Sequence, residues 1–250
     1  KLTELEKSAC PGAGACGGQF TANTMSTAME LIGISPMGTN SIPAMDPEKD
    51  QAAFAAGELL MQMLRAGVSA REILSKQAFE NAIAGIVATG GSTNGVLHLL
   101  ALAREANVDL KIDDFDRVSA KTPIWANMKP WGQFTAPDMH QAGGIRLIAN
   151  RLLEAGLLNK EAKTVTGKTI GEEAADAQET PQQQVVLPLK EPISPTGGLA
   201  ILRGNLSPEG CVMKVAGQKQ LSFKGPARVF DSEEEAFKAV EDRKIQAGDV

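Results

Sequence analysis

The chain has 250 residues, of which 43% are hydrophobic and 22% are charged, and its formal net charge is -5 at pH 7. This composition is that of an ordinary globular protein and excludes a disordered or fibrous chain. Positive and negative side chains are interspersed without a basic run, so the sequence offers no electrostatic surface for nucleic acid or an anionic membrane. No apolar stretch approaches the roughly 20 residues that a membrane-spanning helix needs. We therefore expect a small-molecule partner, without nucleic acid and without a membrane.

The number of cysteines and the two chain ends add further expectations. Three cysteines are too few for a disulfide framework, and an odd number is typical of a reducing compartment in which thiols stay free or bind metal. The chain starts at Lys1 without a methionine, and it stops at Val250 in a turn that normally leads into a strand. We therefore interpret the sequence as an internal piece of a longer protein and expect any site in it to be incomplete.

The first two thirds of the chain predict mainly helices. Apolar residues recur at helical spacing in the segments 21–34, 46–66, 76–87, 96–106 and 143–156. Thr21 or Asn23 is expected to cap the first of these helices. The segment 96–106 is apolar on nearly every side, which predicts a helix that is buried on most sides.

The last third predicts β structure. Short runs of apolar and β-branched residues occur at 199–202, 211–215 and 227–230, and glycine and proline separate them as in an all-β sheet or barrel. An amphipathic helix is predicted over 232–240, with three glutamates in its first turn.

The change in composition near Thr180 predicts two structural parts. We expect an α/β fold in which a mainly helical, three-layer portion extends over residues 1–178. A proline-rich linker over 179–195 follows it. Residues 196–250 are then expected to begin a β-rich domain that resembles a swivelling β-barrel.

Two of the cysteines, Cys10 and Cys16, lie in a glycine-rich loop that leads into the first predicted helix. An isolated cysteine is most often a small buried apolar residue. Here the neighbouring glycines let the backbone fold tightly around a sulfur atom, and a helix start lowers the pKa of a nearby thiol. The loop therefore favours a thiolate that binds metal.

The spacing of these cysteines bears on which metal they could bind. C-x5-C is not a common zinc spacing, and the sequence holds no second pair of cysteines or histidines to complete a tetrahedral zinc site. Zinc is therefore the weaker candidate. An iron–sulfur site, with cysteines drawn from distant parts of a longer chain, stays open.

A second glycine-rich loop, Thr89–Gly95, opens the helix predicted over 96–106. One interpretation is a capped helix start, in which Ser92, Thr93 or Asn94 accepts backbone N–H groups. The other is a binding loop, in which Gly91 and its neighbours hold a carboxylate or phosphate at the helix N-terminus. The sequence leaves both interpretations open.

The chain has two histidines with different surroundings. His98 lies on the apolar face of a predicted helix, which is typical of a core histidine. His140 lies beside Asp138, just before another helix start at Gly143 and Gly144. We therefore treat His140 as a candidate residue of the site.

Four motifs together resemble one enzyme family. They are residues 10–25, 88–99, 138–144 and 193–206, and in this order they resemble the dihydroxy-acid and 6-phosphogluconate dehydratase family. The resemblance covers essentially all 250 residues. Family members are more than twice this length, and the chain resembles their middle.

The resemblance implies a hydro-lyase that converts 2,3-dihydroxy acids, such as 2,3-dihydroxy-3-methylbutanoate, to 2-oxo acids in branched-chain amino-acid biosynthesis. It implies an iron–sulfur cluster, 2Fe-2S or 4Fe-4S, that acts as the Lewis acid, and a Mg²⁺ ion. It assigns Cys16 to the cluster, because sugar-acid members resemble the loop at Cys16 but not at Cys10. Cys10 is then a neighbour of the cluster, and Gly91–Asn94 and His140 line the substrate side.

The remaining functional groups of the family belong to motifs that this sequence lacks. These are two further cluster cysteines, the magnesium-binding acids, a modified lysine and the serine that acts as base. The fragment is therefore expected to be inactive alone. The resemblance further implies a homodimer in a bacterial cytoplasm or a plastid stroma.

Three alternatives stay open. The chain could belong to a sugar-acid or 6-phosphogluconate dehydratase of the same family, although neither glycine-rich loop holds an arginine or lysine to pair with a phosphate. It could be a redox module that forms a reversible disulfide between Cys10 and Cys16. It could also be an anion-binding protein that uses the helix starts at Gly90 and Gly143.

Overall fold

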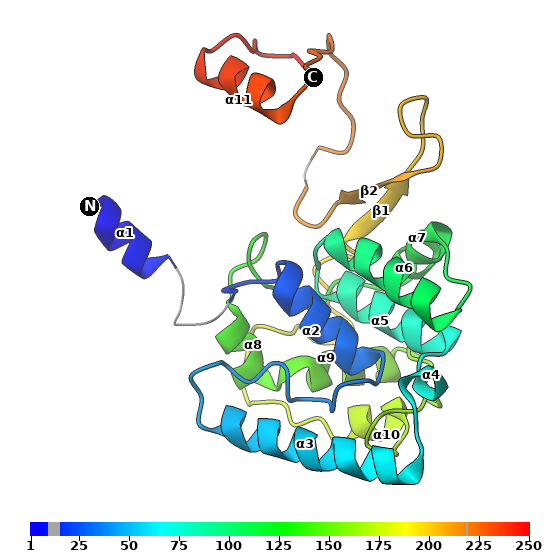
Figure 1. Cartoon of the computed structure of the whole chain (residues 1–250). Helices are drawn as coiled ribbons and strands as arrows, with labels where there is room; N and C mark the ends of the chain where they lie inside the picture. Colours follow the sequence, from blue (N-terminus) through cyan, green and yellow to red (C-terminus); the bar gives the residue numbers. More distant parts are fainter. Residues whose placement is uncertain (10–15, 219) are drawn as a thin grey trace. The chain divides into compact units, whose positions relative to one another are not determined.

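The computed structural model describes residues 1–9, 16–218 and 220–250. The described residues divide into two compact units, Lys1–Gly217 and Gln218–Val250. The elements of the first unit are α1 (Leu2–Ser8), α2 (Thr21–Leu31), α3 (Glu48–Ala66), α4 (Ala70–Ile73), α5 (Lys76–Ala88), α6 (Asn94–Ala106), α7 (Ile112–Ser119), α8 (Ala136–Ala142), α9 (Gly144–Glu154), α10 (Ile170–Ala175), β1 (Leu199–Leu202) and β2 (Cys211–Lys214). The second unit contains α11 (Glu233–Glu241). Figure 1 shows the predominance of helices along the chain.

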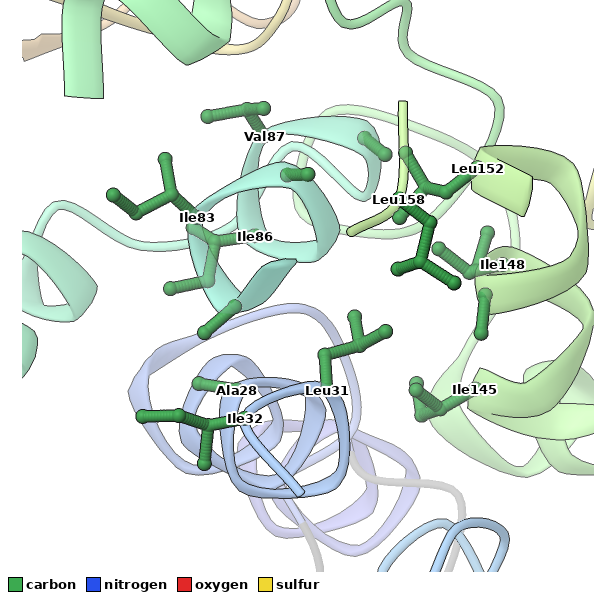
Figure 2. Packing of buried hydrophobic residues seen from close by; sticks show 14 of the residues in the cluster. Ala28, Leu31, Ile32, Ile83, Ile86, Val87, Ile145, Ile148, Leu152 and Leu158 are labelled. Carbon is green, nitrogen blue, oxygen red and sulfur yellow. The ribbon is translucent and has the colours of Figure 1, made fainter. Parts of the chain in front are cut away.

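The core of the first unit is built around α5, most of whose residues are buried. Helix α2 packs against α5 through Ala28, Leu31 and Ile32, and Figure 2 shows Ile83 and Ile86 of α5 close to them. Helix α9 contacts both α2 and α5 and contributes apolar residues such as Ile148 to the same cluster. This packing confirms the predicted helices and fixes α2, which begins a few residues after Cys16.

The prediction for the burial of α6 was wrong. Among its residues only Gly95, Val96, Leu99 and Ala103 are buried within the described chain, and Leu97 is 63% exposed. The helix packs on α2, α5 and α7, which cover one face of it. Its apolar composition does not reveal which face its neighbours cover.

The predicted strands at 199–202 and 211–215 are confirmed as β1 and β2. They pair antiparallel, with Leu199 opposite Lys214 and Leu202 opposite Cys211. The hairpin lies on α7, where the hydroxyl of Ser119 donates to the carbonyl oxygen of Leu199 at 2.6 Å. The described residues are thus rich in helix with a small two-stranded sheet, which is compatible with the predicted α/β fold. The three-layer arrangement and the barrel-like domain stay predictions.

The predicted strand at 227–230 was wrong. In the described part of the second unit, this segment is irregular and contacts the end of the chain. The N–H of Arg228 donates to the carbonyl oxygen of Val250, and the N–H of Val250 donates to the carbonyl oxygen of Pro226. Pro226 has no N–H to donate, so these two bonds do not extend into a ladder.

Residues 179–195, the predicted linker, run beside residues 124–128 in the first unit. Isolated β-bridges join Ala126 to Val186 and Ile124 to Ser194. Val186 is buried against the core. The predicted division of the chain at this segment stays a prediction.

Candidate functional site

Cys16 lies just before α2, and its side chain is half-buried. Within the described residues Cys16 forms no disulfide, and its thiol lies 3.4 Å from the carbonyl oxygen of Gly18, toward which it donates. The other candidate ligand, Cys10, lies outside the described residues. The structure therefore places one candidate thiol.

Asn23 holds the backbone of residues 16–19, which we call the Cys16 loop. Its side-chain amide donates to the carbonyl oxygens of Cys16 and Gly18, both at 2.7 Å. The prediction that Asn23 or Thr21 caps α2 was wrong, because the N-cap residue is Phe20 and no side-chain cap bond is present among the described residues. Asn23 points back toward the preceding loop, where it fixes the position of Cys16.

The opposite side of the Cys16 loop lies against residues 129–136. The N–H of Gln19 donates to the carbonyl oxygen of Lys129 at 2.6 Å, and the carbonyl oxygen of Gly17 accepts from the N–H of Ala136 at 3.2 Å. A Cβ atom at Gly18 would lie 2.6 Å from the carbonyl oxygen of Lys129. Only glycine permits this approach of two backbones.

The two glycine-rich loops meet at the start of α2. The buried amide of Gln19 donates to the hydroxyl of Thr89 at 2.8 Å. The hydroxyl of Thr24 accepts from the N–H of Ser92 at 2.9 Å, and the amide of Asn94 donates to the hydroxyl of Thr21 at 2.7 Å. The structure thus brings the loop 89–94 next to the segment that follows Cys16.

Most backbone N–H groups of the second loop already have acceptors within the protein. The N–H of Gly91 donates to Ile86 at 2.8 Å, and the N–H of Asn94 donates to the hydroxyl of Ser92 at 3.2 Å. The N-cap residue of α6 is Thr93, whose side chain makes no cap bond in the described chain. Any anion bound by this loop would therefore depend on hydroxyl and amide side chains.

The two histidines lie on different helices. His98 is half-buried on α6, so it is less enclosed than a core histidine. His140 is half-buried in the last turn of α8, whose first turn lies beside the Cys16 loop. A role for His140 in the site stays a prediction.

A cavity of about 240 Å³ opens beside Cys16. Its polar lining consists of Asn23, Ser26, Asn40, Ser41 and Lys49. Its remaining lining is largely apolar and comes from α2, from the segment that follows Ser41 and from the start of α8: Ala22, Ile42, Pro43, Ala44, Ala136 and Pro137. Among the described residues, no aspartate or glutamate lines this cavity.

The sequence analysis missed the cavity wall formed by residues 40–49. The segment Gly38-Thr-Asn-Ser41 is rich in hydroxyl and amide groups, and it lies a few residues after the helix that Cys16 precedes. This proximity along the chain was the available signal. Ordinary turns have the same composition, however, so the signal is weak.

Glu30 of α2 fixes the start of this wall through hydrogen bonds. Its carboxylate is fully buried and accepts from the N–H of Gly38 at 2.8 Å and from the N–H of Asn40 at 2.7 Å. Burial raises the pKa of Glu30 to about 7, and the N–H donors and the nearby Arg146 oppose this rise. The carboxylate holds both residues that flank Thr39.

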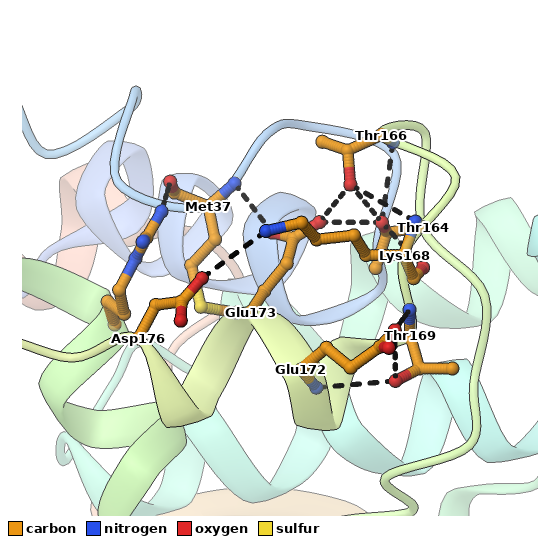
Figure 3. A network of polar contacts seen from close by, with 9 residues as sticks. Met37, Thr164, Thr166, Lys168, Thr169, Glu172, Glu173 and Asp176 are labelled. Carbon is orange, nitrogen blue, oxygen red and sulfur yellow. Dashed lines mark hydrogen bonds and ion pairs between the residues drawn. The ribbon is translucent and has the colours of Figure 1, made fainter.

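A second buried carboxylate holds the same segment at Met37 (Figure 3). Glu173, on α10, is 4% exposed and accepts from the N–H of Met37 at 3.2 Å and from the hydroxyls of Thr164 and Thr166, both at 2.6 Å. The guanidinium of Arg146 donates to the carbonyl oxygen of Met37 at 2.6 Å. The wall of the cavity is therefore fixed at several consecutive residues.

The residues present can be compared with what an iron–sulfur cluster requires. Among the described residues, no group of three or more histidine, cysteine, aspartate and glutamate side chains lies close enough to hold a metal ion. Cys16 alone fits the cluster as a single ligand, because its thiol is half-buried, borders the cavity and lies on a loop fixed by Asn23. Further ligands would come from outside the described residues.

Family comparisons cover nearly the whole chain. Residues 1–173 match the N-terminal region described as dihydroxy-acid/6-phosphogluconate dehydratase N-terminal. Residues 184–250 match the C-terminal region described as dihydroxy-acid/6-phosphogluconate dehydratase C-terminal.

Individual relatives are similar over the same length. A protein named dihydroxy-acid dehydratase from Koribacter versatilis is 62% identical over 249 residues, which cover all of this chain and 44% of the relative. Proteins of the same name from Roseiflexus sp. and Thermus thermophilus are 56% and 52% identical over the whole chain, and the match covers 45% of each. The chain thus spans a little less than half the length of these relatives. Among the described residues, no helix combines the length and the apolar character needed to cross a bilayer.

Proposed function

Because the chain belongs to the dihydroxy-acid/6-phosphogluconate dehydratase family, we propose that it supplies the Cys16 side of the active site of a hydro-lyase. The reaction removes water from a 2,3-dihydroxy acid and yields a 2-oxo acid. The observation that carries this proposal is the fixed, half-buried thiol of Cys16 at the edge of a small cavity with both polar and apolar walls.

The chemistry requires a Lewis acid at the departing C3 hydroxyl and a base for the C2 proton. An iron–sulfur cluster supplies the Lewis acid when it is bound, and Cys16 would be one of its ligands. The bonds from Asn23 fix the loop that carries Cys16. The base, the remaining cluster cysteines and the ligands of Mg²⁺ would come from outside the described residues.

The cavity favours a branched aliphatic substrate such as 2,3-dihydroxy-3-methylbutanoate. Ile42, Pro43, Ala136 and Pro137 provide apolar surface for methyl groups, while Asn23, Ser26, Asn40 and Ser41 provide partners for two hydroxyls. Among the described residues, Lys49 is the one cationic side chain that lines the cavity, so no cluster of cations is present there for a phosphate. We therefore propose that the reaction belongs to branched-chain amino-acid biosynthesis.

A sugar-acid dehydratase of the same family is the second candidate function. The four amide and hydroxyl side chains of the cavity favour it, because a sugar acid presents several hydroxyls. The bacterial relatives support a cytoplasmic enzyme, and we propose that it works as a homodimer.

The proposed function is tested by activity of the intact protein after anaerobic reconstitution with iron, sulfide and Mg²⁺. Formation of a 2-oxo acid is measured from 2,3-dihydroxy-3-methylbutanoate and, in parallel, from gluconate and 6-phosphogluconate. A higher kcat/KM for the branched acid supports the proposal. A preference for gluconate favours the second candidate, and the absence of 2-oxo acid from all three substrates contradicts both.

A further inference from the structure

Lys49, the second residue of α3, is half-buried at the wall of the cavity beside Cys16. Its ammonium group donates to the carbonyl oxygen of Thr39 at 3.0 Å. Within the described chain, Lys49 takes part in no ion pair. An ammonium group has three N–H donors, so two donors remain for a ligand.

The nearby acidic residues do not occupy these donors. Glu48 and Asp50, which flank Lys49 in sequence, are exposed and do not line the cavity. Asp46 accepts the N–H of Glu48 at 3.0 Å, as a capping residue does at a helix start. The cavity side of Lys49 therefore carries positive charge that the described acidic residues leave available.

The position of this charge is fixed by the anchored wall. The acceptor of Lys49, Thr39, lies between Gly38 and Asn40, whose N–H groups both bind the buried carboxylate of Glu30. A side chain held on such a preorganised backbone loses less conformational freedom when a ligand binds. Lys49 thus combines charge, available donors and a fixed anchor at one end of a small polar cavity.

We propose that Lys49 binds the carboxylate of the substrate in the cavity beside Cys16. This inference rests on the proposed function, which requires a monocarboxylic acid with two hydroxyls. A single ammonium suits one carboxylate, and Asn23, Ser26, Asn40 and Ser41 remain for the hydroxyls. Because the carboxylate carries the same charge in the substrate and the product, Lys49 binds both.

The experiment compares, by calorimetry, the binding of a charged and an uncharged ligand of the same shape to the intact holoprotein. The probes are the product 3-methyl-2-oxobutanoate, which is not turned over, and its amide. The variants are Lys49→Met, Lys49→Arg and the control Arg65→Met. Arg65 lies exposed in the last turn of the same helix, so its replacement removes an equal charge away from the cavity.

The wild-type protein is expected to bind the acid about 10-fold or more tightly than the amide, because a charge-assisted hydrogen bond is lost with the amide. Lys49→Met should abolish this preference and raise KM for the dihydroxy acid, whereas Arg65→Met should keep it and Lys49→Arg should keep most of it. A structural role would not change the preference for acid over amide. Lys49→Gln replaces Lys49→Met if the latter does not fold.

An unchanged preference in Lys49→Met overturns the inference, whether or not the protein is a dehydratase. A preference that depends on Lys49, found in a protein that forms no 2-oxo acid, leaves Lys49 as a carboxylate-binding residue and contradicts the proposed function. Wild-type protein that binds neither probe contradicts the inference.

Discussion

The side-chain amide of Gln19 donates to the hydroxyl of Thr89 at 2.8 Å, and both residues are buried. This bond joins the segment after Cys16 to the start of the second glycine-rich loop, 70 residues away along the chain. The same amide donates to the hydroxyl of Thr27 at 3.2 Å. Gln19 is therefore a buried connection between the two loops that the sequence motifs identified.

Replacing Gln19 by leucine should lower the free energy of unfolding by about 1–3 kcal/mol, because the hydroxyls of Thr27 and Thr89 lose a buried donor. Urea denaturation measures this change. Gln62→Leu is the control, because Gln62 is exposed on α3. Equal unfolding free energies for Gln19→Leu and the wild type would show that the connection contributes nothing to stability.

If Cys16 is a cluster ligand as proposed, Cys16→Ser should remove the visible absorption of the reconstituted cluster and the proposed dehydratase activity of the intact protein. Cys211→Ser should leave both unchanged, because Cys211 is an exposed residue of β2. The measurements are iron content, absorption spectrum and 2-oxo acid formation after the same reconstitution. A Cys16→Ser protein that holds as much iron as the wild type rules out Cys16 as a cluster ligand.

The predicted and observed folds agree where local sequence determines the structure. Helices α2, α5 and α9 were predicted because their apolar residues repeat at helical spacing and their ends carry capping or glycine signals. The exposure of α6 was not predicted, because it depends on which neighbours pack against the helix. The strand predicted at 227–230 is absent for a similar reason: a strand also needs a pairing partner, and the β propensity of its residues does not provide one.

In the candidate site, too, features set by local sequence were predicted and features set by tertiary packing were missed. The glycine-rich loop of Cys16 was visible in the sequence, because a close approach of two backbones requires glycine. Lys49 and Asn40 were missed, because each has an ordinary role in a helix start or a turn and only tertiary packing brings them to Cys16. Glu30 offered a signal, since it is the one charged residue of helix α2.

The buried Glu30 predicts how stability depends on pH. Its pKa is raised from 4.5 to about 7 in the folded protein, so the folded state binds a proton that the unfolded state has already released in this range. Stability contributed by this group is therefore present below about pH 4.5 and is lost as the pH rises toward 7. The loss is of the order of 3 kcal/mol, because one pKa unit corresponds to about 1.4 kcal/mol.

Glu30→Gln isolates this contribution, because the amide does not titrate. The unfolding free energy of the wild type minus that of Glu30→Gln should fall between pH 5 and pH 8, as measured by urea denaturation at each pH. Glu58→Gln is the control, since Glu58 is exposed on α3. A difference that rises or stays constant with pH contradicts the raised pKa of Glu30.

The loop 89–94 allows its structural and binding roles to be separated with two variants. A Cβ at Gly91 would lie 2.9 Å from the Cγ2 of Ile86 and 3.1 Å from that of Thr24, so Gly91→Ala should destabilise the protein by about 1–3 kcal/mol through overpacking. Thr93 makes no side-chain cap bond within the described residues, so Thr93→Ala should leave Tm nearly unchanged. Thr93 therefore reports on binding with little structural cost.

If the loop contacts the substrate, Thr93→Ala should lower kcat/KM of the intact protein by about tenfold for each 1.4 kcal/mol of transition-state binding lost. Ser222→Ala is a control for a hydroxyl on an exposed segment of the second unit. Tm and steady-state kinetics are measured on the same preparations, so that a loss of folded protein is not mistaken for a loss of binding. Normal turnover by Thr93→Ala would remove Thr93 from the substrate site. Together with a lower Tm for Gly91→Ala, that result would leave the loop as a structural connection between α5 and α6, because most of its N–H groups already have acceptors within the protein.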